Sequence, residues 1–180
     1  DPNRFSEDGT ISLAGTYFSE DGSLLAYTIS EGGSDWRKVI VIETENKTVI
    51  GDTLFDVKFS GISWNGNNGF YYSSYEKPKK SALSEKTDRH ILYYHTLNSS
   101  QKNDKVIFGH KEKFRYLSGY ITEDQNYLVI SGSKETSGNN LYIKDLKKNK
   151  AKLIQLTQNF ESNSYIIHNI KSKLYISTNL

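Results

Sequence analysis

The sequence has no cysteine, no methionine and only two prolines among its 180 residues. Without cysteine the chain can form neither disulfides nor thiolate metal sites, and its redox compartment stays undecided. An excess of one charge is also missing, since 23 Lys and Arg against 21 Asp and Glu leave a net charge of only +2. Proteins that bind nucleic acid concentrate basic residues on one face. We therefore expect no nucleic-acid partner.

Long apolar runs and targeting segments are absent as well. No run approaches the roughly 18 apolar residues that would cross a membrane, and no signal peptide is visible, so we expect no membrane partner. We expect a cytoplasmic location, with the periplasm as the alternative. The chain opens on Asp1 and lacks methionine, which we interpret as the mark of a segment excised from a longer protein.

Aromatic residues are plentiful, with 13 Tyr and 8 Phe, and one aromatic stretch shows how the chain is built. Residues 17–27 read YFSEDGSLLAY, two apolar runs joined by a Ser-Glu-Asp-Gly turn. Glycine accepts the positive φ that tight turns demand, and Asp-Gly between apolar runs is typical of a β-hairpin. The sequence therefore predicts a hairpin at this position.

This hairpin pattern repeats along the chain. Further copies, the last of them degraded, lie at residues 62–72, 121–130 and 167–176. Taking Phe18, Ile62, Ile121 and Ile167 as equivalent positions, the steps between them are 44, 59 and 46 residues. A second hairpin lies between successive copies, so each period holds four strands. Periods of about 40 to 50 residues with four strands are typical of β-propeller blades.

We therefore predict an all-β fold, a partial β-propeller with about three four-stranded antiparallel blades and the start of a fourth. The blades are expected near residues 14–60, 61–117 and 118–163, with the partial blade at 164–180. No window keeps a 3.6-residue apolar period over three turns, so no helix is expected. Propellers need about 4 to 8 blades to close, and open strand edges pair readily with other chains. We expect either further sequence that completes the ring or self-association through the open edges.

The longest of the three steps is explained by one polar segment. Residues 76–90 (EKPKKSALSEKTDRH) are rich in lysine and lack the alternation of a strand. We interpret them as an exposed loop within the second blade. The alternative is a basic segment that binds an acidic partner.

Two serines resemble the nucleophile of a hydrolase at first sight, Ser34 in GGSDW and Ser63 in GISWN. A nucleophile elbow needs glycine on both sides of the serine and a turn from a strand into a helix. Trp36 and Asn65 stand where the second glycine is required, and a further strand is expected after Ser34. Neither serine is therefore expected to be catalytic.

The remaining candidates for chemistry are histidines and paired acids. The four histidines, which show no recognised zinc spacing, are His90, His95, His110 and His168. His90 and His95 lie five residues apart on one expected strand, so they would point to opposite faces and could not share a metal. The acidic pairs 20–21 and 123–124 lie in turns, where carboxylates commonly bind local backbone amides. No metal, cofactor or catalytic residue is expected, and the residues taken alone indicate a binding or scaffolding surface.

A series of longer motifs follows in a fixed order along the chain. It comprises DPN, YFSEDG, LAY, GSDW, VKFSGISW, GFYY and YYH-x-L, with Gln101 and Asp104 downstream. WD repeats, with their Gly-His and Trp-Asp dipeptides, are not matched. The ordered series resembles the propeller of the prolyl oligopeptidase family of serine peptidases, up to about Leu146 and more weakly beyond it.

The resemblance implies a function for the parent protein. That family joins a seven-bladed propeller to an α/β-hydrolase domain with a Ser-Asp-His triad, and it cleaves short peptides after proline. This chain would supply blades two to four and the start of the fifth, and it would gate and filter substrates. The triad would lie outside it, so the chain alone is expected to be inactive. The implied partners are the hydrolase domain and short proline-containing peptides. The alternatives are a non-catalytic interaction scaffold and a dipeptidyl-peptidase-like propeller.

The resemblance also carries two substrate contacts onto this sequence. In the family, the Phe of the Val-Lys-Phe-Ser stretch reaches the substrate from the propeller, and here that residue is Phe59. The alternative is that Phe59 packs in the blade core. A second contact lies at residues 134–136, where Thr136 is the candidate. The family has Arg and Cys in this region, whereas this sequence has Ser133 and Thr136.

Overall fold

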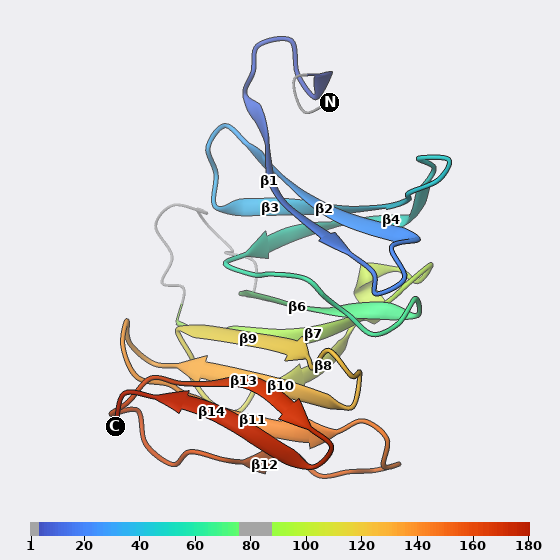
Figure 1. The fold of residues 1–180 in the computed structure, drawn as a ribbon. Helices are drawn as coiled ribbons and strands as arrows, with labels where there is room; N and C mark the ends of the chain where they lie inside the picture. The colour runs from blue at the N-terminus through green and yellow to red at the C-terminus, as the bar shows by residue number, and fades with distance from the viewer. Residues whose placement is uncertain (1–3, 76–87) are drawn as a thin grey trace.

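The computed structural model describes residues 4–75 and 88–180, which form three four-stranded antiparallel sheets and a final hairpin (Figure 1). The first sheet contains β1 (Ile11–Phe18), β2 (Leu24–Glu31), β3 (Trp36–Glu43) and β4 (Val49–Lys58). The second contains β5 (Ser63–Trp64), β6 (Gly69–Tyr75), β7 (His90–Thr96) and β8 (Lys105–Phe108). The third contains β9 (Tyr116–Ile121), β10 (Tyr127–Ser133), β11 (Asn140–Asp145) and β12 (Ile154–Gln155). The last hairpin pairs β13 (Ser164–Ile170) with β14 (Lys173–Thr178).

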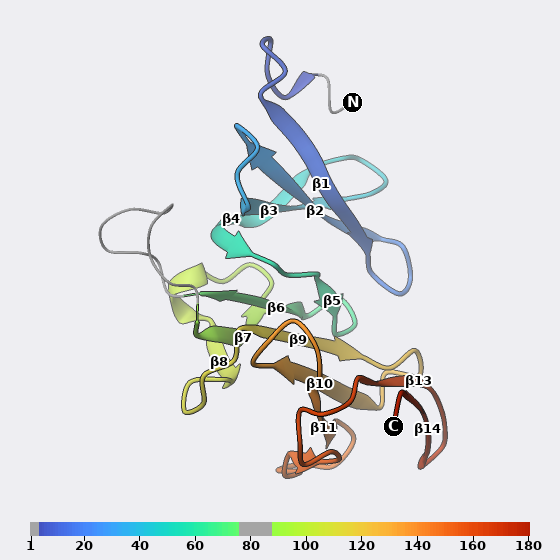
Figure 2. The ribbon, with the colours of Figure 1, turned by 90° about the vertical axis from the view of Figure 1, so that its left-hand side faces the viewer.

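The all-β prediction is confirmed, and the sheets are propeller-like. Within each four-stranded sheet the spatial order of the strands equals their order in sequence. The first strands of the units, β1, β5, β9 and β13, gather on one side of the stack, and the outer strands β4 and β8 lie on the other (Figure 2). The sheets form an open fan. Among the described residues the one helical element after residue 10 is a short 3-10 turn at Gln101–Asn103, and no described helix could span a membrane.

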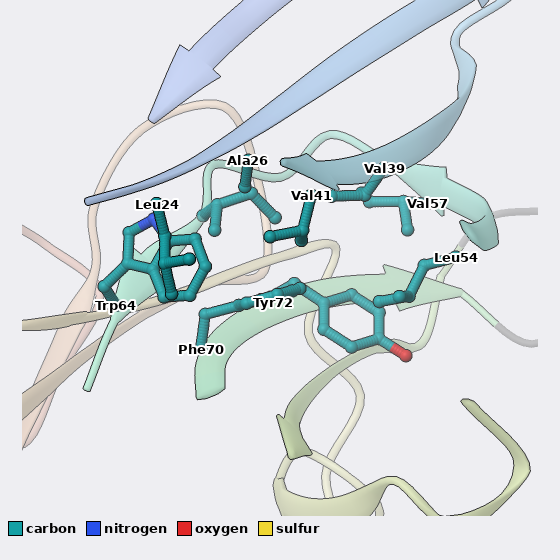
Figure 3. Close-up of a cluster of buried hydrophobic side chains, with 10 residues drawn as sticks. Leu24, Ala26, Val39, Val41, Leu54, Val57, Trp64, Phe70 and Tyr72 are labelled. Atoms are coloured by element: carbon teal, nitrogen blue, oxygen red, sulfur yellow. The ribbon is translucent and has the colours of Figure 1, made fainter. Parts of the chain in front are cut away.

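Alternating side chains hold neighbouring sheets together. In β6, Phe70 and Tyr72 pack toward the first sheet, whereas Tyr71 packs toward the third. Successive residues of a strand point to opposite faces, so a strand between two sheets must be apolar on both, and every residue of β6 is buried. Figure 3 shows Phe70 and Tyr72 facing the side chains that the first sheet contributes to this core, namely Leu24, Ala26, Val39, Val41, Leu54 and Val57.

The connections between strands lie on two opposite faces, because antiparallel neighbours reverse direction. We call one the hairpin face; it carries the turns from each first to each second strand, at residues 19–23, 65–68, 122–126 and 171–172. We call the other the link face; it carries the links between units and the turns from second to third strands, including residues 59–62, 109–115, 134–139 and 156–163. The link face lies at the left of Figure 1 and toward the viewer in Figure 2.

In each of the two expected acidic pairs, the aspartate behaves as expected from the sequence. Asp21 accepts hydrogen bonds from the amide N–H and the hydroxyl of Ser23 at 3.0 and 2.8 Å. These bonds hold the pKa of Asp21 well below its usual value. Asp124 likewise accepts from the N–H of Asn126 at 3.2 Å. The acids therefore order local turns, and Asn67 from the next unit also donates to Asp21 at 2.8 Å.

Two further predictions concern the polar loop at residues 76–90 and self-association through open strand edges. Most of the expected loop at 76–90 lies outside the described residues, but His90 at its end is a buried residue of β7. The last hairpin leaves several large apolar side chains exposed, namely Tyr165, Ile167, Ile170, Tyr175 and Ile176. Self-association through open edges stays a prediction.

Candidate functional site

The two candidate serines have structural roles. Ser34 lies in the turn between β2 and β3, where its hydroxyl oxygen accepts from the N–H of Trp36 at 3.1 Å. Ser63 lies in β5, and its hydroxyl oxygen accepts from the N–H of Ile121 in the third sheet at 2.9 Å. A strand follows each serine in place of the helix that an elbow needs. The strand expected after Ser34 is present, and the expectation that neither serine is catalytic stays a prediction.

Two of the four histidines are fully buried and face opposite sides of β7. His95 contacts Phe70, with ring centroids 5.2 Å apart, and its Nδ1 lies 2.8 Å from a carboxylate oxygen of Asp104. His90 instead lies against the third sheet, as described below. Exposed His168 lies 3.8 Å from Glu123. No group of three or more metal-ligating side chains occurs within residues 4–75 and 88–180.

A pocket of about 200 Å³ opens on the link face, and it contains both substrate contacts expected from the sequence. We call it the link-face pocket. Its walls come from the first inter-sheet link, from β9 and β10, from the turn at 134–139 and from the start of β13. The lining residues are Phe59, Tyr116, Leu117, Ser118, Ser131, Ser133, Thr136, Asn139, Asn163 and Tyr165. The fold therefore brings Phe59 and Thr136, which are distant in sequence, to one cavity.

Phe59 is 43% exposed, so the alternative that it packs in the blade core is wrong. It follows the end of β4 with a left-handed φ of 52°, a conformation that costs a bulky residue about 1–2 kcal/mol. Its ring makes edge contacts with Tyr75 and Tyr116, at centroid distances of 6.3 and 6.0 Å. Strained residues of this kind cluster at ligand-binding positions. The backbone thus holds an aromatic ring at the pocket instead of in the core.

The pocket is lined by uncharged side chains and bordered by cations that lie over aromatic rings. The ammonium of Lys58 lies 5.0 Å from the Phe59 ring centroid, and the guanidinium of Arg115 lies 5.4 Å from that of Tyr116. Serine and threonine hydroxyls, which both donate and accept hydrogen bonds, line much of the remainder. This combination of aromatic rings and hydroxyls suits a neutral, partly apolar ligand such as a peptide side chain.

Asn139 is a lining residue of the pocket that connects two units of the fold. It is buried, its Nδ2 donates to the Ser131 hydroxyl at 2.7 Å and to the Ser164 carbonyl at 2.8 Å, and its Oδ1 accepts from the N–H of Ser164 at 2.7 Å. These bonds join the third sheet to the last hairpin. No local sequence pattern predicts Asn139, Tyr116 or Tyr165 as pocket residues, because their meeting depends on how separate units pack.

His90 lies behind the rings of Phe59 and Tyr116, which we call the aromatic wall, and it connects the first sheet to the third. Its Nε2–H donates to the Lys58 carbonyl at 2.9 Å, and its Nδ1 accepts from the N–H of Leu117 at 2.9 Å. Its ring stacks on Tyr75 with centroids 4.3 Å apart. Burial lowers the pKa of His90 to about 4 from 6.5, although the hydrogen bond to Lys58 opposes this shift.

This buried imidazole predicts a pH dependence of stability. A folded-state pKa below the unfolded value means that the stabilisation is complete above pH 6.5 and is lost as the pH falls toward 4. We expect the His90 imidazole to lower the free energy of unfolding by about 3 kcal/mol as the pH falls from about 7.5 to about 4. Urea unfolding of the protein and of His90→Asn across this pH range measures the effect. The difference between their free energies of unfolding contains the contribution of His90 alone. A difference that does not change with pH would contradict the prediction.

Comparison with known proteins agrees with the fold. The sequence profile of the prolyl oligopeptidase N-terminal β-propeller domain matches residues 1–180, including the part beyond Leu146 where the motifs weaken. The chain belongs to the prolyl oligopeptidase N-terminal β-propeller family. It is 54% identical to a prolyl endopeptidase of Elizabethkingia miricola and 51% identical to that of Elizabethkingia meningoseptica, over 99% of this chain in both cases.

Each of these relatives is much longer than the chain, which covers 25% of its length. The chain thus spans about a quarter of the prolyl endopeptidases that it matches. Among solved structures, prolyl oligopeptidase B from Galerina marginata, bound to a 35-residue hydrolysis and macrocyclization substrate, superposes with a TM-score of 0.86. That likeness covers 100% of this chain and 27% of the other, at 25% sequence identity. The chain therefore has the propeller fold of this family.

Proposed function

We propose that this chain is part of the propeller of a prolyl endopeptidase, a serine peptidase that cleaves short peptides after proline. Family membership supports the activity, and the chain's share of its relatives supports a separate hydrolase domain that carries the triad. In this proposal the propeller contributes no catalytic group. It restricts access to the active site and contacts the peptide.

The observation that carries the contact role is the meeting of Phe59 and Thr136 in the link-face pocket. The left-handed backbone that holds the Phe59 ring outward costs free energy. An apolar ligand that covers the ring removes apolar surface from water and offsets this cost. Ser133 and Thr136 contribute uncharged hydroxyls that can form hydrogen bonds with a ligand. A basic residue at either position would instead favour an acidic peptide. We infer that the pocket binds a neutral side chain of the peptide.

Replacing Phe59 with alanine in the full-length enzyme tests this function. With a chromogenic peptide that ends in proline, we expect hydrolysis that a serine-directed inhibitor blocks, and a KM about 5- to 20-fold higher in Phe59→Ala, with little change in kcat. The ring would bind ground state and transition state equally, and losing about 1–2 kcal/mol of apolar contact raises KM by this factor.

Phe55→Ala is the matched control, because Phe55 is similarly exposed, at 48%, but lies on β4 away from the link-face pocket. It should leave KM unchanged. Equal kinetics in all three proteins would contradict the pocket's role. A full-length protein without proline-specific hydrolysis would instead favour the interaction scaffold.

A further inference from the structure

One buried residue, His90, does not line the link-face pocket but binds the backbone beside it. His90 is 0% exposed, so it cannot touch a peptide in the pocket. Its two ring nitrogens are nevertheless both occupied, by groups from the first and third sheets. The N–H of Leu117 requires a lone pair on Nδ1, which places the proton on Nε2 and fixes the neutral tautomer. The imidazole therefore acts as a two-sided hydrogen-bond bridge between these sheets.

Both ends of the bridge lie next to pocket aromatics. The Lys58 carbonyl belongs to the peptide group that joins Lys58 to Phe59, and the orientation of this group depends on the ψ angle of Lys58 and the φ angle of Phe59. The Leu117 N–H belongs to the peptide group that joins Tyr116 to Leu117, and the orientation of this group depends on the ψ angle of Tyr116 and the φ angle of Leu117. His90 thus constrains the orientation of one peptide group beside each of the two rings, whose centroids lie 6.0 Å apart.

Tyr75 completes the support behind the wall. Its ring stacks on His90 and makes an edge contact with Phe59, and its hydroxyl donates to the Arg115 carbonyl. An apolar residue could fill the position of His90 and still stack on Tyr75. It could not hold two backbone groups, one of them beside a residue in the disfavoured left-handed region. The use of both nitrogens therefore explains why a histidine occupies this core position.

We propose that His90 is a positioning residue for peptide binding, which holds Phe59 and Tyr116 as the aromatic wall of the link-face pocket. This inference deepens the proposed function and rests on it. His90 affects peptide affinity only through these two residues and makes no contact with the substrate.

Two substitutions in the full-length enzyme each remove one of the two hydrogen bonds of His90, to Lys58 or to Leu117. His90→Asn keeps an acceptor near the Nδ1 position for Leu117 and loses the donor to Lys58. His90→Gln keeps a donor near the Nε2 position for Lys58 and loses the acceptor. Each lost hydrogen bond should raise KM for the proline peptide about 5-fold, with kcat changed less than about twofold. Because each variant keeps a different half, either one that folds decides the inference.

A double-mutant cycle distinguishes positioning from a general loss of stability. The KM effect of His90→Asn should vanish in a Phe59→Ala background, and that of His90→Gln should vanish in a Tyr116→Ala background. Val41→Ala is the stability control, since Val41 is fully buried in the core between the first two sheets and lies outside the pocket. It should lower Tm without raising KM.

The outcomes separate this inference from the function on which it rests. If Phe59→Ala raises KM but neither His90 variant does beyond Val41→Ala, the positioning role is overturned and the pocket stands. A KM effect of His90 that persists unchanged in both aromatic backgrounds also overturns it. If Phe59→Ala and Tyr116→Ala leave KM unchanged, the pocket does not bind the peptide, and both the contact role of the pocket and the positioning role of His90 are overturned.

Discussion

Gly138→Ala is expected to lower the free energy of unfolding by about 4 kcal/mol, the sum of backbone strain and a steric clash. Gly138 lies in the turn that carries Thr136 and has a left-handed φ of 75°. A Cβ at this position would lie 1.6 Å from the carbonyl oxygen of Phe160. That oxygen belongs to the backbone, so it cannot turn away unless the link at 156–163 moves. The N–H of Gly138 also donates to Asn163 at 2.8 Å, which holds the two segments together.

Gly22→Ala is the matched control for this substitution. Gly22 has nearly the same φ, 71°, but apart from its two chain neighbours no described residue has an atom within 4 Å of a Cβ built there. It should therefore show only the backbone strain, about 1 kcal/mol. Urea unfolding of both variants measures the difference. Equal losses would mean that the turn and the link separate readily, contrary to the close contact described here.

Asp104→Ala is the second substitution with a large expected effect, a loss of about 3–4 kcal/mol. The side chain of Asp104 is 3% exposed and accepts from the Tyr72 hydroxyl at 2.7 Å and from the Nδ1–H of His95 at 2.8 Å. Alanine would leave both donors buried without an acceptor. Tyr72 lies in the core between the first and second sheets, so its unpaired hydroxyl would remain at a largely buried position. Burial, assisted by this carboxylate, raises the pKa of Tyr72.

Asp104→Asn tests which property of Asp104 matters. The amide oxygen can accept from Tyr72, and the amide N–H can donate to His95 in its other tautomer. We expect a loss of only about 1 kcal/mol, since no donor is left unpaired. Thermal and urea unfolding of the two variants side by side provide the measurement. If asparagine were as damaging as alanine, the negative charge and not the accepting atoms would be the stabilising feature.

Much of the fold was predictable from the sequence because its signals are local. The Asp-Gly turn at 21–22 and the repeat of apolar runs predicted hairpins, and the spacing of the copies predicted four-stranded units. Turn chemistry acts over two or three residues, as the bonds of Asp21 to Ser23 show. Neighbouring units need not be known for such a pattern to be recognised.

The candidate site was predictable only in part. The resemblance of residues 57–64 to the family marked Phe59, but the residue type alone was equally consistent with a core position. The left-handed backbone after β4, held against the second and third sheets, decided that Phe59 faces outward. The strand position of His90 opposite His95 was predicted, but its burial was not, because His90 ends a polar, lysine-rich stretch. Its burial depends on Lys58 and Leu117, which lie 32 and 27 residues away in the chain.

The sequence by itself determined the all-β class and the repeating four-stranded unit, because both follow from residues close together in the chain. The tertiary structure alone decided which side chains from separate units meet at the link face. A strand's two faces are equivalent in a local pattern, and only the stacking of the sheets distinguishes them. The pocket of Phe59 and Thr136, with His90 behind its wall, exists because three sheets pack side by side.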